Sequence, residues 1–547
     1  MDPGAAMTLP HERVAETLAA VAGPEAVAAE LLCDRHPPDA VAVRVVEPDL
    51  TSTDLTYGEL HDRSARLATA LAGLGVGVGD RVATLMPKSA DLVVAALAIW
   101  RLGAVQVPLF TAFARPAIAL RITGNGTKAV ICDPSQRPKL APGDGIPDAP
   151  EWRVISTGAA TGTDLALHDL LTAEPWPHPA AVGGEGTLVE LFTSGTTGAP
   201  KAVPLPLRAV AAILMYQEYG LDHRPDDVFW NAADPGWAYG LYYGLIGPLA
   251  LGRTTLLLHS AFSPELTWSV LARFGVTNFT AGPTVFRALR AQTPVRAEPL
   301  ALRHCSSAGE PLGADVVAWA ERTLGVPVRD HYGQTELGMA VANAWHPEVA
   351  APLRPGSMGR ALPGWRLDVL RPDADEPAPR GTPGRLAVDV ESSPLMWFTG
   401  YRDAPERTAE RFTADGRWYL TGDAAAQDDD GYLTFASRDD DVILMAGYRI
   451  GPYEVESLLE RHEAVAEAAV VGAPDDLRGE IVVAHVVLRQ GAEPGDALVD
   501  ELQKHVKTHL AAHSYPREIR FVNRLPRTPS GKLQRYLLRE SDGSRQS

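Results

Sequence analysis

Cysteine is scarce in this sequence, and its spacing suits neither a metal site nor a disulfide framework. The 547 residues include three cysteines, Cys33, Cys132 and Cys305, which stand far apart and form no C-x-x-C pair. Such usage is typical of a protein in a reducing compartment, so we expect a cytoplasmic location. The first residues also lack a basic start followed by an apolar core, so no secretory signal is expected.

Long apolar runs are missing as well. The longest uncharged run of note, 235–252, is interrupted by five glycines and two prolines. A membrane-spanning helix needs about 20 consecutive and mostly apolar residues. We therefore interpret 235–252 as buried core and pocket wall, and we expect no membrane span.

Positive charge is also in short supply. Lysine and arginine number 50 against 68 aspartates and glutamates, which gives a formal net charge of −18. An acidic surface repels the phosphates of nucleic acids and the headgroups of anionic lipids, so we expect neither as a partner. A local basic site for an anionic substrate is still compatible with this balance.

Strand-like and helix-like segments alternate in the first half of the chain. Arg81–Pro87 is typical of a buried strand, Ser89–Val105 of a helix with Ser89 as its N-cap, and Ala129–Asp133 of the next strand. This alternation predicts an α/β fold, with mostly parallel sheets flanked by helices. A single hydrophobic core stops growing at about 250–300 residues, so we expect several subdomains.

The pattern changes after about residue 355. Short segments with turns between them predict a β-rich subdomain there. Further on, two amphipathic helices, 451–465 and 497–516, enclose strand-like segments. We expect a large N-terminal domain, 1–438, that binds nucleotide and substrate, and a small mobile α+β C-terminal domain, 439–547.

One glycine-rich loop is a candidate anion site. Residues 191–203, LFTSGTTGAPKAV, combine glycines that let the backbone approach an oxyanion with hydroxyl donors and a lysine. The spacing is not that of the P-loop G-x-x-x-x-G-K-[ST], because Ala202 follows the lysine. A surface turn is the alternative without function. The proposed phosphate-binding residues are Thr193, Ser194, Gly195, Thr196, Thr197, Gly198 and Lys201.

Four further segments follow in a fixed order along the chain. They are HYGQTELG at 331–338, WYLTGD at 418–423, SRDDDVILMAGYRIGPYEVES at 437–457 and RTPSGK at 527–532. Together with the loop, they resemble the motif series of the adenylate-forming (AMP-binding) superfamily, which includes acyl-CoA synthetases, luciferase-like enzymes and the adenylation domains of nonribosomal peptide synthetases. GYRIGPYEVES, PLMWFTGYRDAPERTAE and WYLTGD are particularly similar to medium-chain acyl-CoA synthetases, cousins of acetyl-CoA synthetase.

The resemblance implies a two-step, AMP-forming acid–thiol ligase. A carboxylate attacks the α-phosphorus of ATP, with Mg²⁺ present, to give an acyl-adenylate and pyrophosphate. The thiol of CoA then displaces AMP. Because the first step brings two anions together, catalysis rests on positioning and on charge neutralisation.

The resemblance also implies a role for individual residues. Thr335 would contact the α-phosphate, Glu336 would hold Mg²⁺, and Lys532 would neutralise charge during adenylation only. Beyond the loop, the ATP- and AMP-binding residues would be Gly309, Glu310, Pro311, Tyr332, Gly333, Gln334, Asp423 and Arg438. The hinge between domains would be Asp440, and rotation about it would bring Ala446, Gly447 and Arg449 to the site for CoA.

The acyl pocket follows from the likeness to acetyl-CoA synthetase. It would be lined by Trp237, Ala238, Tyr239, Ala308 and Gly333. Acetate-specific relatives carry a tryptophan at the position of Gly333, so glycine there would leave room for a medium-chain or aromatic acid. An alternative interpretation is that Trp237 and Tyr239 are simple core aromatics.

Two other functions remain open from the sequence. The adenylate could pass to a carrier protein or an amine, or another oxyanion such as nitrite could be activated, as in diazo-forming ligases. A non-catalytic binding protein that retains the fold is the third possibility. Gly447 and Arg449 favour CoA as the acceptor.

Overall fold

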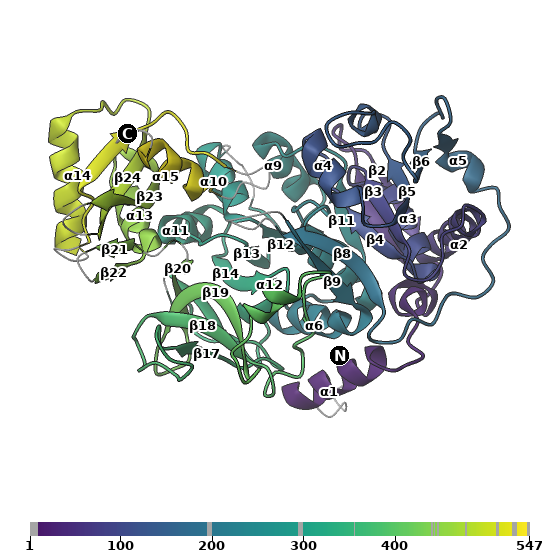
Figure 1. Cartoon of the computed structure of the whole chain (residues 1–547), viewed down its shortest axis with the longest axis horizontal. Helices are drawn as coiled ribbons and strands as arrows, with labels where there is room; N and C mark the ends of the chain where they lie inside the picture. The colour runs from purple at the N-terminus through teal and green to yellow at the C-terminus, as the bar shows by residue number, and fades with distance from the viewer. Residues whose placement is uncertain are drawn as a thin grey trace.

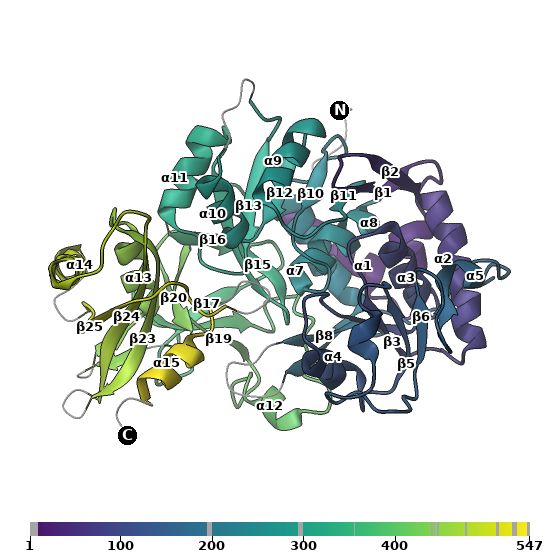
Figure 2. The same ribbon diagram turned by 90° about the horizontal axis from the view of Figure 1, so that it is seen from above.

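The computed structural model describes residues 9–193, 200–293, 299–354, 356–438, 441, 443–445, 448–475, 479–509, 514–527 and 533–543. Within this part of the chain the strands form sheets of seven, thirteen and five strands. Figures 1 and 2 show the first half of the chain at one end of the molecule and the C-terminal residues at the other. The α/β class expected from the sequence is confirmed.

The seven-stranded sheet carries the hairpin that bounds the glycine-rich loop. Its strands are β3 (Arg81–Leu85), β4 (Val105–Pro108), β5 (Thr127–Cys132), β6 (Arg153–Ser156), β7 (Leu165–Ala166), β8 (Thr187–Thr193) and β9 (Lys201–Pro206). Their order is β7-β6-β5-β3-β4-β8-β9, and only the β8–β9 pair is antiparallel. Thr193 pairs with Lys201 where the hairpin opens into the loop.

Helix α3 (Ala90–Arg101) confirms the strand–helix–strand prediction. The hydroxyl of Ser89 accepts a hydrogen bond from the backbone N–H of Leu92 at 3.2 Å, which is the expected N-cap. Gly103 follows the helix in the left-handed region, with φ of 69°. Glycine adopts that conformation without steric cost, so the chain can turn directly into β4.

The thirteen-stranded sheet has a parallel half and an antiparallel half. Its strands are β1 (Val41–Val46), β2 (Ser52–Thr56), β10 (Phe229–Asn231), β11 (Thr255–Leu258), β12 (Asn278–Ala281), β13 (His304–Ala308), β14 (Val328–Gln334), β15 (Gly338–Ala342), β16 (Ser357–Ala361), β17 (Leu367–Leu370), β18 (Gly384–Asp389), β19 (Trp418–Gln427) and β20 (Leu433–Arg438). Their order is β17-β18-β19-β20-β16-β15-β14-β13-β12-β10-β11-β1-β2. From β14 to β1 the pairs are parallel, whereas those from β14 to β17 are antiparallel. The antiparallel half begins at β14 and β15, and its strands β16 to β20 form the β-rich part expected after residue 355.

Helices pack against the parallel half of this sheet. Trp268 and Trp319, from helices on one side, share a core with Trp230 and Phe279 of the strands. Trp268 lies on α9 (Pro264–Arg273) and Trp319 on α11 (Ala314–Thr323), with α10 (Pro283–Ala291) between them in the chain. Elsewhere in the chain up to residue 438 the structure contains α1 (Pro10–Val21), α2 (Tyr57–Gly73), α4 (Arg115–Ile122), α5 (Leu167–Leu170), α6 (Val210–Met215) and α12 (Pro405–Ala409).

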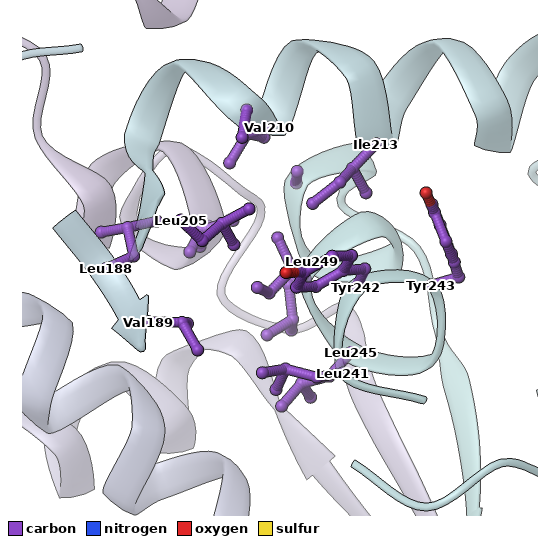
Figure 3. Close-up of a cluster of buried hydrophobic side chains, with 14 of the residues drawn as sticks. Leu188, Val189, Leu205, Val210, Ile213, Leu241, Tyr242, Tyr243, Leu245 and Leu249 are labelled. Carbon is purple, nitrogen blue, oxygen red and sulfur yellow. The ribbon is translucent and has the colours of Figure 1, made fainter. Parts of the chain in front are cut away.

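The uncharged run 235–252 lies in the core, as expected. It forms α7 (Ala238–Leu241), a π-helical turn (Tyr242–Ile246) and α8 (Gly247–Leu251). Figure 3 shows its side chains packed against those of β8 and α6. Among the described residues, no helix combines the length and the apolar character that a membrane crossing requires.

The C-terminal sheet has a separate core on each face. Its strands are β21 (Ile443–Met445), β22 (Tyr448–Ile450), β23 (Val465–Asp475), β24 (Gly479–Leu488) and β25 (Glu518–Phe521), and its helices are α13 (Pro452–Glu460), α14 (Asp496–His509) and α15 (Arg535–Gly543). Val470 packs with the cluster that includes α13 and α14, whereas Val471 packs with Leu538 of α15. Successive strand residues point to opposite faces, so one hairpin supports both helical layers.

Candidate active site

The predicted site residues gather where parallel strands of the large sheet end. Ala308 is the last residue of β13 and pairs with His331 of β14. Beyond them, Gly309 turns the chain with φ of 100°, and Gln334 ends β14. The carboxyl ends of parallel strands form the usual ligand-binding edge of an α/β sheet.

Asp423 joins two motifs that lie far apart in sequence. Its Oδ2 accepts hydrogen bonds from the hydroxyl of Tyr332 at 2.6 Å and from Nε2 of Gln334 at 2.7 Å. Gln334 also donates to the carbonyl of Thr421 at 2.8 Å. Arg438 stands opposite Asp423 in the β19–β20 pair. The structure therefore brings these four predicted nucleotide-binding positions together.

Glu336 is buried beside residues that the sequence did not single out. Its Oε1 accepts a hydrogen bond from the hydroxyl of Tyr401 at 2.8 Å, and Arg411 donates to the same hydroxyl at 3.1 Å. Nζ of Lys201 lies 4.8 Å from the centre of the Tyr401 ring. Tyr401 and Arg411 come from the GYRDAPERTAERF segment, whose similarity was visible but whose contacts were not.

Lys201 occupies a site that favours an anionic ligand. Burial lowers its pKa from the usual value, and the nearby guanidinium of Arg411 lowers that pKa further. A phosphate group would supply the missing negative charge and stabilise the ammonium form. This environment matches the phosphate-binding role expected for the loop.

The donor set around Glu336 fits Mg²⁺ bound together with phosphate. In the described residues no group of three or more His, Cys, Asp or Glu side chains could enclose a metal. Mg²⁺ is usually held by one or two carboxylates, water and substrate phosphates, so a single buried glutamate beside a phosphate site meets its needs.

Glu310 is oriented by other side chains of the protein. Its carboxylate pairs with Arg287 at 2.6 Å and accepts from the hydroxyl of Thr284 at 3.2 Å. Arg527 of the C-terminal part lies 4.0 Å away. If the Gly309–Pro311 segment contacts adenine as predicted, its backbone would make that contact.

Of the five residues predicted to line the acyl pocket, Ala238 and Tyr239 lie on α7 and Trp237 directly precedes it, whereas Ala308 ends β13 and Gly333 lies on β14. Trp237 packs against Phe110 and Phe113, with ring centres 5.5 and 5.3 Å away. The hydroxyl of Tyr239 lies 3.3 Å from that of Tyr216, which in turn lies 2.7 Å from Nδ1 of His331. Burial lowers the pKa of His331 to about 3, so this chain of polar groups is neutral.

Two tyrosines connect α7 to the nucleotide motif. The hydroxyl of Tyr242 donates to the carbonyl of Thr335 at 3.2 Å. The hydroxyl of Tyr243 accepts from the backbone N–H of Met339 at 2.6 Å. The predicted wall of the acyl pocket is thus attached to the segment that is expected to contact the α-phosphate.

Gly333 has a backbone reason to be glycine that the sequence did not reveal. A Cβ at this position would lie 2.0 Å from the carbonyl oxygen of Gly338 and 2.7 Å from Cα of Met339. The β14–β15 pair is irregular at this residue. The backbone therefore constrains Gly333 independently of its predicted places in the acyl pocket and at the nucleotide site, and those two roles stay predictions.

Part of the predicted site lies outside the described residues. This holds for Ser194, Gly195, Thr196, Thr197, Gly198, Asp440, Ala446, Gly447 and Lys532. Arg449 is placed by its backbone in β22, opposite Leu444 of β21.

Comparison with known proteins decides the family. The model of the AMP-binding enzymes matches residues 30–401, and that of the AMP-binding enzyme C-terminal domain matches residues 454–532. The chain belongs to the AMP-binding enzyme family. It is accordingly an AMP-forming acid–thiol ligase, an acyl-CoA synthetase that uses ATP, Mg²⁺ and CoA and acts on a carboxylic acid.

Relatives of this synthetase differ in their named substrates. It is 35% identical to the acetyl-coenzyme A synthetase of Bacillus subtilis, over 88% of this chain and 84% of that protein. The structure of Brucella canis acyl-CoA synthetase is similar with 43% identity and a TM-score of 0.75, covering 98% of each chain. The benzoate CoA ligase of Burkholderia xenovorans has 28% identity and a TM-score of 0.81, covering 96% of this chain and 99% of its own.

Asp423→Asn tests the nucleotide site of the synthetase. Asparagine keeps the shape of the side chain but lacks the negatively charged carboxylate. That carboxylate accepts hydrogen bonds from Tyr332 and Gln334 and would accept them from the ribose hydroxyls. Since a hydrogen bond to a charged group contributes about 1.5–3 kcal/mol, calorimetry should show ATP affinity reduced by roughly 10- to 100-fold. Asp389→Asn, another buried carboxylate, is the matched control. Equal losses in both variants would contradict a specific role.

Gly333→Ala tests the close approach of β15. The added methyl group would meet the Gly338 carbonyl, and overpacking of this kind costs about 1–3 kcal/mol. Urea unfolding should show that loss in the free energy of unfolding. Gly73→Ala, at the end of α2 where no atom lies within 4 Å of the new Cβ, should keep or raise stability. Unchanged stability of Gly333→Ala would show that β14 and β15 can separate enough to accept a side chain, and would contradict the prediction.

Proposed function

We propose that this synthetase activates a medium-chain or aromatic carboxylic acid rather than acetate, and transfers the acyl group to CoA. The observation that carries the proposal is the surface of α7. Trp237, Ala238 and Tyr239 are only half-buried, although the next residues, Gly240 and Leu241, are fully buried. Small and aromatic side chains with accessible surface at the end of β13 suit an acyl group larger than a methyl.

The first step joins the acid to the α-phosphorus of ATP. Asp423 and Tyr332 would hold the ribose and adenine, while the Tyr242 hydroxyl fixes the backbone of Thr335 near the α-phosphate. Lys201 would neutralise the departing pyrophosphate. Glu336 would hold Mg²⁺, which would supply positive charge where negative charge accumulates on the phosphates.

The second step uses the C-terminal domain, which we propose to rotate about Asp440. Two observations, the end of a strand and a set of ion pairs, support a domain boundary between residues 438 and 439. Arg438 closes β20 of the large sheet, whereas Asp441 is held by Arg535 at 3.3 Å and Arg539 at 2.7 Å, both on α15. Residues on the two sides of Asp440 are thus attached to different sheets.

After rotation, Gly447 and Arg449 would replace Lys532 at the site and admit the CoA thiol.

A cytoplasmic location is part of the proposal. It is supported by Cys33, Cys132 and Cys305, which are buried, unpaired thiols and suit a reducing compartment.

A panel of acids tests the acyl preference. Release of AMP and pyrophosphate should be faster with six- to ten-carbon or benzoate-type acids than with acetate, by about 10-fold or more, because each buried methylene contributes about 0.8 kcal/mol. The same panel is run with and without CoA. Turnover with an amine or a carrier protein instead of CoA, or with nitrite as the oxyanion, would favour the alternative acceptor or substrate, and preference for acetate would contradict the pocket assignment.

Lys532→Ala separates the two half-reactions. Loss of this cation should slow acyl-adenylate formation by about 100-fold or more, because charge in the transition state is no longer neutralised. Thioester formation from synthetic acyl-AMP should be nearly unchanged. Lys504→Ala, an exposed lysine of α14, is the control that should affect neither step. Equal loss in both half-reactions would contradict the proposed division between them.

A further inference from the structure

Tyr401 lies where three charged groups of the candidate site meet. Its hydroxyl donates to Glu336 at 2.8 Å and accepts from Arg411 at 3.1 Å, and its ring lies beneath Lys201. The position of Tyr401 therefore sets the geometry between the proposed metal ligand and the proposed phosphate ligand.

The segment that carries Tyr401 runs along the outer edge of β9. The backbone N–H of Arg402 donates to the carbonyl of Ala202 at 3.0 Å, next to Lys201. Pro204 lies further along the same strand and lines, with 399–402, a recess of about 650 Å³. A proline has no N–H for a neighbouring strand, so the edge contact cannot continue past it as a regular ladder.

A buried carboxylate on β8 forms an ion pair with the same segment. Glu190, with a side chain that is 1% exposed, pairs with Arg402 at 2.7 Å and with Arg81 at 3.5 Å. Burial raises the pKa of Glu190, and the two guanidinium groups oppose that shift. The second ion pair of Arg402, at 3.5 Å, is with the highly exposed Asp403, which solvent screens.

Loss of the Glu190 charge would therefore release Arg402. The two arginines would then face each other without their shared counter-ion, and the recess beside them gives Arg402 room to move away. Since Tyr401 is the adjacent residue, its hydroxyl would move relative to Glu336. Loss of this buried ion pair is therefore expected to change the geometry of the candidate site as well as the stability of the protein.

We propose that Glu190 is a positioning residue which, through Arg402 and Tyr401, orients Glu336 and Lys201 for Mg²⁺ and ATP phosphate. The inference rests on the roles of Glu336 and Lys201 given under the proposed function. It adds that a buried carboxylate of β8, the strand that leads into the phosphate loop, helps to align Glu336 with Lys201, together with the backbone contact between Arg402 and Ala202.

The test measures ATP binding by calorimetry as a function of Mg²⁺ concentration, which needs no knowledge of the acid. Glu190→Gln and Arg402→Lys should each raise the Mg²⁺ concentration for half-maximal binding, as should Tyr401→Phe. Partners of a metal ligand typically change metal affinity by about 10- to 100-fold, and we expect the lower end. The double variant Glu190→Gln, Tyr401→Phe should show no more than the larger single effect, because both act on one pathway.

Asp164→Asn is the matched control. Asp164 is also a buried carboxylate paired with an arginine, Arg137 at 2.6 Å, but it lies away from the site. It should lower the melting temperature as Glu190→Gln does and leave the Mg²⁺ dependence unchanged. Arg402→Lys, whose side chain is partly exposed, gives the same test if Glu190→Gln folds poorly.

Two outcomes separate this inference from the proposed function. If Glu336→Gln removes the Mg²⁺ dependence but Glu190→Gln and Arg402→Lys do not change it, the inference alone is overturned. If Glu336→Gln itself has no effect, the role of Glu336 is wrong and the inference falls with it. Additive effects of Glu190→Gln and Tyr401→Phe would also overturn it.

Discussion

The buried carboxylate of Asp423 needs hydrogen-bond donors, and that need fixes the shape of the largest sheet. The donors, Tyr332 and Gln334, lie on β14, four steps along the sheet from β19. With about 4.8 Å between neighbouring strands, a flat sheet would place these strands about 19 Å apart. The hydroxyl of Tyr332 nevertheless lies 2.6 Å from the carboxylate. The antiparallel half must therefore curl back over the ends of the parallel strands, which creates an enclosed edge for a nucleotide.

A second carboxylate connects that edge to the other large sheet. Glu336 follows β14, and Lys201 begins β9 of the seven-stranded sheet, yet both contact Tyr401. The site thus lies at a junction of two sheets that share one apolar core, and non-directional packing does not by itself set the orientation of its polar side chains. Polar contacts in a low-dielectric interior are strong but directional, so they can set such an alignment where apolar packing cannot. Glu190 acts in the same way, because its ion pair with Arg402 orients the segment that carries Tyr401.

Local sequence signals predicted the elements well and the contacts between them less well. Ser89 and the strands beside it could be predicted because a cap and a run of apolar residues act within a few positions. The motifs located Asp423, Tyr332 and Glu336. Tyr401, Arg411 and Glu190 were missed because their importance arises from partners scores of residues away. Gly333 shows the same limit, since its constraint is the approach of Gly338 across an irregular strand pair.

Polar contacts join the large part of the chain to the C-terminal part. Glu310 faces Arg527 of the C-terminal part at 4.0 Å and also pairs with Arg287 at 2.6 Å, so its carboxylate would keep a partner in the proposed rotation. Burial raises the pKa of Glu460, on α13, to about 7, so at neutral pH this carboxyl group carries only part of a full charge. The hydroxyl of Tyr453, on α13, also donates a hydrogen bond to the carbonyl of Leu312, which orients the C-terminal part against the large part. Polar contacts of this kind suit the domain rotation that we propose.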